Sequence, residues 1–375
     1  MGNIFRSCEA SNLLDFDCLV KVYHCKALSL HGTIIVGKVF YEEVKMVTKQ
    51  PLLDVRNLKT YFYKKGKELP VVDDVSFQVH EGETVAIVGE SGSGKSMTTL
   101  SIMQLVPSPG GKTVGGEILF NGDDLLKHGQ DRMFKVRGND IGMIFQEPMT
   151  SLNPVLTIGD QLMETLIYHQ KLSKKQAYVR AKEMLELVGF SRIDEILSDY
   201  PHRLSGGMRQ RVMIAMAMSC DPKLLIADEP TTALDVTVQA QILDLMRGLS
   251  EKFNSSIILI THDLGVVAEL ADRVVVMYAG QVVEEADIVP LFDKPLHPYT
   301  VGLMESVPKL DVEQDRLTSI AGNVPTPDNF PKGCRFVTRC PLAFDRCSNE
   351  QPQLVEVEAG RKVRCFLHEE GRNES

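Results

Sequence analysis

One stretch of eight residues, 89–96, restricts what this chain can fold into more than any other. It reads Gly-Glu-Ser-Gly-Ser-Gly-Lys-Ser and fits the G-x-x-x-x-G-K-[ST] pattern of a phosphate-binding loop. The short, apolar, β-branched run before it predicts a buried strand at 84–88, and the run after it predicts a helix at 97–105. A strand, a glycine loop and a helix start, in this order, predict an α/β protein that binds a nucleotide.

The residue types in this loop suit a nucleoside triphosphate and its magnesium ion. Glycines let the backbone turn so that successive N–H groups face an anion, and the helix N-terminus adds partial positive charge. Lys95 is expected to reach the β- and γ-phosphates, and the Ser96 hydroxyl to bind Mg²⁺. The expected nucleotide contacts around the loop are Gly89, Ser91, Gly92, Gly94, Lys95, Ser96 and Met97.

Length and composition limit the alternatives. A chain of 375 residues has room for two or three domains, and its net charge of −9 argues against a general nucleic-acid binder. No apolar run approaches the roughly 18 residues of a membrane span, and the N-terminus lacks the layout of a signal peptide. We therefore expect a cytoplasmic protein. Four of the eight cysteines lie in the last 42 residues, and in a reducing compartment such clustering favours a metal over disulfides.

Residues 1–49 carry no recognisable motif. They hold three scattered cysteines (Cys8, Cys18 and Cys25), and Met46 stands just before the first convincing strand. Either translation starts at Met46 or the segment is a genuine but poorly structured tail. We assign it no role.

Polar residues follow three further predicted strands. Asp228 and Glu229 end the apolar run 223–230: Asp228 is expected to help hold Mg²⁺, and Glu229 to polarise an attacking water. Gln146 follows the strand at 141–145, where it could orient water or complete the Mg²⁺ shell. His262 follows the strand at 257–260; it either bonds a γ-phosphate or is a structural histidine.

The pattern of apolar residues changes at 157–220, where they recur at helical spacing. This helical insertion ends at Ser205, Gly206 and Gly207, which predict either a second anion site or simply a capped helix with a flexible start. Earlier in the chain, any one of Tyr61, Phe62 and Tyr63 could stack on a base or merely cover the sheet edge.

Taken together, these pieces resemble the ATP-binding subunits of ABC transporters across residues 52–285. The matches are 89–96 with Walker A, Gln146 with the Q-loop, 204–210 with the signature, 224–229 with Walker B and its catalytic Glu, 233–235 with the D-loop, and His262 with the switch histidine. The resemblance implies that Phe62 is the aromatic that stacks on the base, and that Asp235 belongs to the nucleotide site. It also implies that Gln146, Glu229 and His262 serve catalysis.

The resemblance explains the two anion sites. In such proteins two ATPase domains face each other head to tail, and the Walker A of one and the Ser-Gly-Gly of the other enclose one ATP. This chain therefore has to pair, with itself or with a second related ATPase. Closure of the pair would drive two transmembrane permease subunits, which receive substrate from an extracytoplasmic binding protein. The expected location is the cytoplasmic face of the cell membrane, with no nucleic-acid partner.

The C-terminal third narrows the resemblance. Residues 297–300 (His-Pro-Tyr-Thr), 331–334 and 339–341 are similar to the tail of oligopeptide and dipeptide importers, which nickel importers share. The implied fold is a P-loop NTPase, with a RecA-like core and an antiparallel β subdomain at 50–287 that includes a helical signature subdomain at about 150–220. A small cysteine-rich domain at 288–375 is expected to follow.

Four cysteines in that tail raise the question of a metal. Zinc sites usually carry a C-x2–4-C pair, which is missing here, whereas the surrounding positive charge suits an anionic [4Fe–4S] cluster. Some importers of this type are similar in carrying such a cluster; zinc, or cysteines without metal, are the alternatives. The residues are Cys334, Cys340, Cys347 and Cys365, with Lys332, Arg335, Arg339, Arg346 and Arg364 around them.

The sequence thus predicts an ATPase that energises peptide import, with ATP, Mg²⁺ and a [4Fe–4S] cluster as cofactors. A nickel or other small-solute importer is the nearest alternative. A soluble ABC ATPase working on DNA or ribosomes, and a redox sensor with an incidental ATPase, are the others. Soluble members usually carry tandem ATPase halves or long coiled-coil insertions, and this chain has neither.

Overall fold

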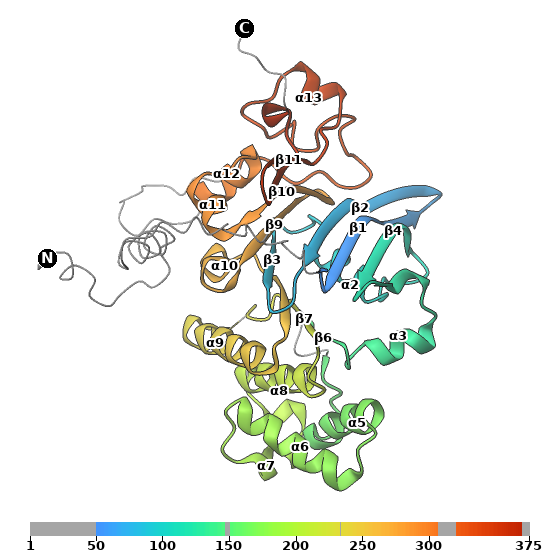
Figure 1. The fold of residues 1–375 in the computed structure, drawn as a ribbon, viewed down its shortest axis with the longest axis vertical. Helices are drawn as coiled ribbons and strands as arrows, with labels where there is room; N and C mark the ends of the chain where they lie inside the picture. The colour runs from blue at the N-terminus through green and yellow to red at the C-terminus, as the bar shows by residue number, and fades with distance from the viewer. Residues whose placement is uncertain (1–49, 147–150, 233, 307–319, 370–375) are drawn as a thin grey trace, which may run out of the picture. The chain divides into compact units, whose positions relative to one another are not determined.

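The computed structural model describes residues 50–146, 151–232, 234–306 and 320–369 (Figure 1). Expectations for residues 1–49, including Met46 and the three cysteines there, fall outside the described residues. The same holds for Ala233 of the expected D-loop.

A mixed sheet forms the centre of the described chain. Among the described residues its strand order is β11-β12-β10-β9-β3-β8-β7-β6, and the part from β9 to β6 is parallel. The central strands are short apolar runs buried on both faces, which is the pattern that parallel sheets favour. The strands are β3 (Thr84–Val88), β6 (Ile141–Ile144), β7 (Leu224–Asp228), β8 (Ser256–Ile260), β9 (Arg273–Tyr278), β10 (Gln281–Asp287), β11 (Val355–Glu358) and β12 (Arg361–Val363).

A second, antiparallel sheet carries the order β2-β1-β4-β5 within the described ranges. Apolar side chains of this sheet, such as Phe77 and Ile118, pack against apolar side chains of the central sheet. Ile87 and Ile258 of the central sheet belong to the same buried cluster. The second sheet is the antiparallel β subdomain that the resemblance implied. Its strands are β1 (Leu53–Lys64), β2 (Lys67–Val79), β4 (Gly111–Phe120) and β5 (Asp123–Asp124).

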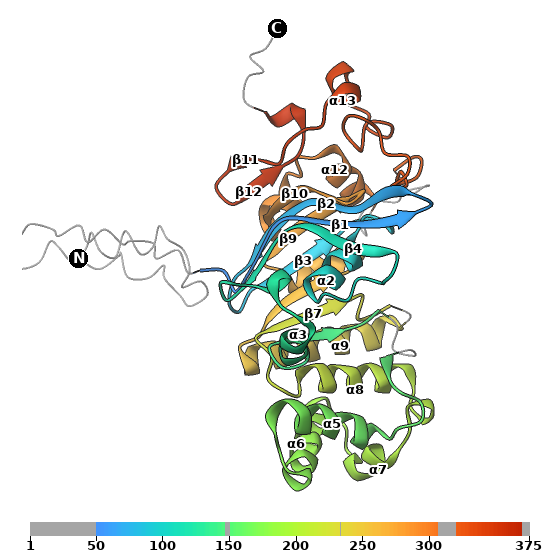
Figure 2. The ribbon, with the colours of Figure 1, turned by 90° about the vertical axis from the view of Figure 1, so that its right-hand side faces the viewer.

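The helical insertion is confirmed as a bundle of short helices. Thr157 caps the first helix, and Ser173 forms a capping box with Gln176 at the second. Figure 2 shows these helices at one end of the described chain and α13 near the other. Their apolar faces pack around Leu162, Met184 and Ile214. The helices are α5 (Ile158–Gln170), α6 (Lys174–Leu187), α7 (Ile193–Ser198), η2 (Pro201–Arg203) and α8 (Gly206–Met218).

The remaining helices cover the sheets or join their strands. The helix after the phosphate loop begins at Lys95 and ends at Ile102, earlier at both ends than the run 97–105 predicted. None of the described helices is long and apolar enough to cross a membrane. These elements are α2 (Lys95–Ile102), η1 (Leu125–Lys127), α3 (Gln130–Val136), α9 (Val236–Phe253), α10 (Leu264–Leu270), α11 (Ile288–Asp293), α12 (Pro298–Glu305), α13 (Asp345–Asn349) and η3 (Phe366–His368).

The C-terminal residues return to the central sheet. Strand β12 pairs antiparallel with β10, with Val363 opposite Glu284, and β11 pairs with β12. An aromatic cluster of Tyr278, Tyr299 and Phe336 lies beneath this edge, with ring centroids 4.6 to 5.5 Å apart. A cysteine-rich module that stands apart from the ATPase core is therefore not supported. The domain boundary expected after residue 287 stays a prediction.

Candidate active site

The phosphate loop lies between the end of β3 and the start of α2. Gly89 and Gly94 have φ of 150° and 100°, and a Cβ on Gly89 would lie 2.2 Å from the carbonyl oxygen of Met277. Only glycine fits there. The ammonium group of Lys95 donates to the carbonyl oxygens of Gly89 at 2.7 Å and Glu90 at 3.1 Å. The loop thus curves around the amine that is expected to meet the phosphates.

The expected magnesium ligands meet beside this loop. The Ser96 hydroxyl donates to a carboxylate oxygen of Asp228 at 3.0 Å, across from the end of β7. Burial raises the pKa of Asp228 and lowers the pKa of Lys95, because both charged forms lose water. The positive charge of Lys95 lowers the pKa of Asp228, and the negative charge of Asp228 raises the pKa of Lys95, so each group opposes the effect of burial on the other. Asp228 thus provides a buried negative charge for a divalent cation, and Lys95 provides a buried positive charge for a triphosphate.

The polar residues that follow β6 and β8, Gln146 and His262, both contact Glu229 at the end of β7. The backbone of Glu229 has φ of 47°, which is rare for a side-chain-bearing residue and is held by a hydrogen bond from its N–H to Ile260. One carboxylate oxygen accepts from Gln146 at 2.9 Å and from Thr232 at 3.0 Å. The other lies 3.7 Å from Nδ1 of His262. The structure therefore brings together all three residues that we expected to serve catalysis.

A cavity of about 220 Å³ opens over this arrangement. Gly89, Asp228 and His262 border the same region without lining this cavity; His262 and Gly89 line a neighbouring one. The lining residues are Val71, Ser91, Gly92, Gly94, Lys95, Ser96, Met97, Gln146 and Glu229, most of which the sequence predicted.

Phe62 does not line this cavity. Its ring lies against Gly110 and Gly111, and a Cβ on Gly111 would approach Cζ of Phe62 to 2.8 Å. Of its neighbours, Tyr61 donates to Asp73 at 3.1 Å and Tyr63 is exposed. Base stacking by Phe62 stays a prediction.

The serine and two glycines at the start of α8 also lie outside the cavity. Ser205 caps α8 by accepting from the N–H of Met208 at 3.3 Å, which matches the simpler of the two interpretations. A Cβ on Gly207 would lie 3.0 Å from Val238, so the start of α8 packs beside the start of α9. Asp235 caps α9 by accepting from Val238 at 3.0 Å. Gly206 is exposed. Ser205, Gly206, Gly207 and Asp235 thus lie at the adjacent starts of α8 and α9.

The four C-terminal cysteines line one small cavity of about 20 Å³. Burial raises the pKa of Cys334 and Cys365 to about 11, and the neighbouring thiols add to both shifts. A Cβ on Gly333 would lie 2.2 Å from the carbonyl oxygen of Cys347, so glycine permits this close approach. In the parts of the chain that the structure describes, however, no three His, Cys, Asp or Glu side chains are grouped to hold a metal ion. The expected cluster on Cys334, Cys340, Cys347 and Cys365 therefore has no support from the ligand geometry.

Contacts to the loop from the C-terminal third were not predicted. Tyr299 accepts from the N–H of Glu90 at 2.8 Å, and Arg339 pairs with the carboxylate of Glu90. The sequence marked Tyr299 only as part of a family tail, and Arg339 as part of that tail and of the positive charge around the cysteines. No local pattern joins them to the loop.

Comparison with known proteins decides the family. The ABC transporter family model matches residues 72–232, and the model of the oligopeptide/dipeptide transporter C-terminal region matches residues 283–347. The oligopeptide transport ATP-binding protein AppD of Bacillus subtilis is 63% identical over 319 residues, covering 85% of this chain and 97% of AppD. The chain belongs to the ATP-binding subunits of oligopeptide ABC transporters.

Further relatives agree with this membership. OppD of Bacillus subtilis, also an oligopeptide transport ATP-binding protein, is 50% identical over 86% of this chain and 90% of its own length. Among solved structures, the dimeric ATP-binding cassette MJ0796 bound to ADP and phosphate is 28% identical, with a TM-score of 0.57 over 63% of this chain and 98% of that one. The ABC ATPase cassette fold is thus confirmed.

Proposed function

We propose that this chain hydrolyses ATP to energise the import of di- and oligopeptides across the cell membrane. The observation that carries the proposal is one cavity lined by Lys95, Ser96, Gln146 and Glu229. Ser96 donates to Asp228 and Gln146 donates to Glu229. The relatives' names supply oligopeptides as the substrate class, and the matched C-terminal family model adds dipeptides.

In this proposal each residue at the cavity has a role. Lys95 and the loop amides bind the β- and γ-phosphates, and Ser96 and Asp228 bind Mg²⁺ with water completing the shell. Glu229 accepts a proton from the attacking water, while Gln146 orients that carboxylate and His262 bonds the γ-phosphate. Phe62 stacks on the base.

The site is completed by a second ATPase. The exposed start of α8, with Ser205, Gly206 and Gly207, is proposed to bind the γ-phosphate of ATP held by the partner, with Asp235 beside it. The dimeric MJ0796 structures support such pairing. The pair is proposed to lie at the cytoplasmic face of the membrane and to act on two permease subunits, which an extracytoplasmic binding protein supplies.

A [4Fe–4S] cluster on the four cysteines is the remaining part of the proposal. Support comes from the chemistry of the donor set alone, because four thiols line one small cavity and four cysteine thiolates are the usual ligands of such a cluster. The cluster would pin a segment too small to hold a core of its own. Anaerobically purified protein should contain about four iron and four sulfide per chain. Zinc, or no metal, would overturn this part alone.

Uptake in cells tests the function. A strain without this gene should lose uptake of labelled dipeptide and hexapeptide, and the wild-type gene, but not a Lys95→Ala variant, should restore it. Uptake of labelled nickel in the same strains provides the control. Loss of nickel uptake with intact peptide uptake, or no change in either, would contradict the proposal.

A further inference from the structure

Glu90, the second residue of the phosphate loop, is held from the C-terminal third of the chain. Both terminal nitrogens of Arg339 donate to its carboxylate, at 2.6 and 3.0 Å. The hydroxyl of Tyr299 accepts from its backbone N–H at 2.8 Å. These two contacts fix both the side chain and the backbone of a residue that no catalytic motif requires.

The same residue touches the phosphate-binding machinery. The carbonyl oxygen of Glu90 accepts from the Lys95 ammonium at 3.1 Å and from the N–H of Ser93 at 3.2 Å. Its carboxylate is near enough to Lys95 to act on the pKa of that amine. Without a cation beside it, this carboxylate would repel the phosphates of a bound nucleotide.

Arg339 is itself rigidly placed, unlike the arginine of an ordinary surface ion pair. Its side chain is 3% exposed, and it also donates to the backbone oxygens of Ile320 at 3.1 Å and Ala321 at 2.9 Å. The hydrogen bonds to Glu90 are the main cause of its raised pKa. The Glu90 side chain is 32% exposed, so the pair is partly buried, and a two-pronged pair of this kind contributes more than a fully exposed one.

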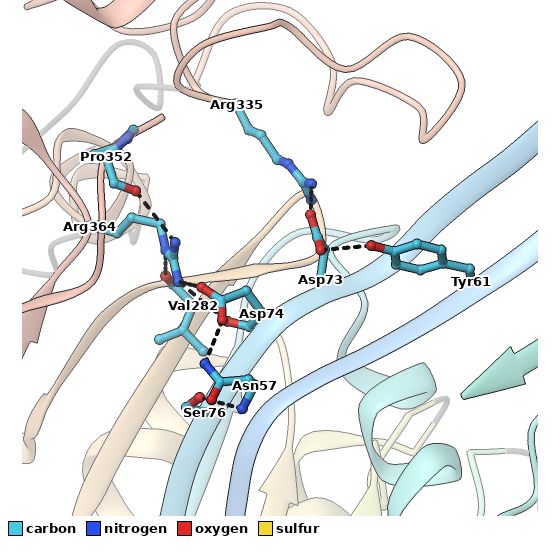
Figure 3. Close-up of polar contacts among 9 residues, drawn as sticks. All are labelled: Asn57, Tyr61, Asp73, Asp74, Ser76, Val282, Arg335, Pro352 and Arg364. Carbon is cyan, nitrogen blue, oxygen red and sulfur yellow. Dashed lines mark hydrogen bonds and ion pairs between the residues drawn. The ribbon is translucent and has the colours of Figure 1, made fainter. Parts of the chain in front are cut away.

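Two further arginines fasten the cysteine-bearing segment, residues 334–365, to strand β2 (Figure 3). Arg335 pairs with Asp73 and donates to the backbone of Ala279. Arg364 pairs with Asp74 at 3.1 Å and donates to the backbone of Val282 at 2.8 Å.

The three arginines share one feature of sequence: Arg335 follows Cys334, Arg339 precedes Cys340 and Arg364 precedes Cys365. The cysteines are thus next in sequence to one arginine that contacts the phosphate loop and to two that contact β2. Val71 of β2 lines the cavity beside the loop.

We propose that Arg339 and Tyr299 are positioning residues for the phosphate loop, and that the cysteine-bearing segment sets the affinity for ATP through Arg339. This inference rests on the proposed function only in taking ATP as the ligand. Because coupling between two sites is reciprocal, bound ATP must in turn stabilise the segment.

The first test is the equilibrium dissociation constant for ATP, measured with a fluorescent ATP analogue. Arg339→Ala should weaken binding about tenfold, the loss expected for a charge-assisted pair. Adding Glu90→Gln to this variant should restore most of the affinity, because it removes the unpaired carboxylate. Arg346→Ala is the matched control: Arg346 also adjoins a cysteine but pairs with Glu350 and Glu369, away from the loop.

The second test is hydrogen–deuterium exchange of the peptide 334–349 with and without a non-hydrolysable ATP analogue. The analogue should slow exchange in the wild type and in Arg346→Ala, but not in Arg339→Ala. If Arg339→Ala fails to fold, Tyr299→Phe still tests the positioning of the loop, since it removes only the hydroxyl that accepts from Glu90; its affinity for ATP should fall about threefold.

Two outcomes would overturn the inference and are distinguishable from failure of the proposed function. One is an affinity of Arg339→Ala or Tyr299→Phe equal to that of the wild type. The other is exchange in 334–349 that ATP does not affect in the wild type. A wild type that does not bind ATP at all would refute the proposed function itself, and this inference with it.

Discussion

The side-chain amide of Gln146 donates to the carboxylate of Glu229 at 2.9 Å, joining residues 83 positions apart in the chain. The two come from the ends of β6 and β7, which are paired in parallel, so their carboxyl ends meet at one edge of the sheet. The hydrogen bond fixes the orientation of the proposed general base. It also ties the base to the residue that follows β6.

Replacing Gln146 by alanine should therefore affect turnover more than binding. We expect kcat to fall about tenfold, with the KM for MgATP within about twofold of the wild type, because the base loses its orientation while the loop contacts remain. Steady-state ATP hydrolysis at saturating Mg²⁺ provides the measurement. Thr232→Val, which removes another hydrogen bond to Glu229, is the control and should cost less than about threefold. A higher KM with unchanged kcat would assign Gln146 to binding alone.

Ser96→Ala should alter the metal requirement. The hydroxyl that donates to Asp228 is the proposed Mg²⁺ ligand, so its loss should raise the Mg²⁺ concentration for half-maximal ATP hydrolysis about tenfold. Ser93→Ala in the same loop is the control, because the Ser93 hydroxyl is buried without a hydrogen-bond partner. Equal Mg²⁺ dependence in the two variants would refute the assignment.

Asp73→Asn should destabilise the fold. Arg335 is only 5% exposed, and the change would leave its guanidinium without a counter-charge. Breaking a buried pair in this way costs about 3 kcal/mol of unfolding free energy. Urea unfolding measures it. Glu350→Gln, which breaks a half-exposed pair with Arg346, should cost less than about 0.5 kcal/mol. Equal losses in the two variants would show that the Arg335 pair is no stronger than a surface one.

Much of the core was predictable because its signals are local. Strand β3 has the bounds that the sequence predicted, since a short β-branched run before a glycine loop has few other interpretations. Helix α9 was missed, although Ile242, Leu243, Met246 and Leu249 recur at helical spacing.

What the sequence could not reveal lies in pairings between distant segments. Glu90 and Arg339 are 249 residues apart, and no period or motif links them. The return of β12 to β10 is also non-local, and it is why the C-terminal residues join the central sheet. The site residues were found by motif, and base stacking by Phe62 stays a prediction, because its side chain does not line the cavity that the other motif residues share.

The most direct test of the account is the rate of ATP hydrolysis by Glu229→Gln compared with the wild type, with ATP affinity measured on the same samples. Glutamine keeps the size of the side chain but cannot accept the proton from water. The account predicts unchanged ATP binding and a turnover at least about a hundredfold lower, which corresponds to roughly 2.7 kcal/mol of barrier. Hydrolysis by this variant at a rate near that of the wild type would contradict the account.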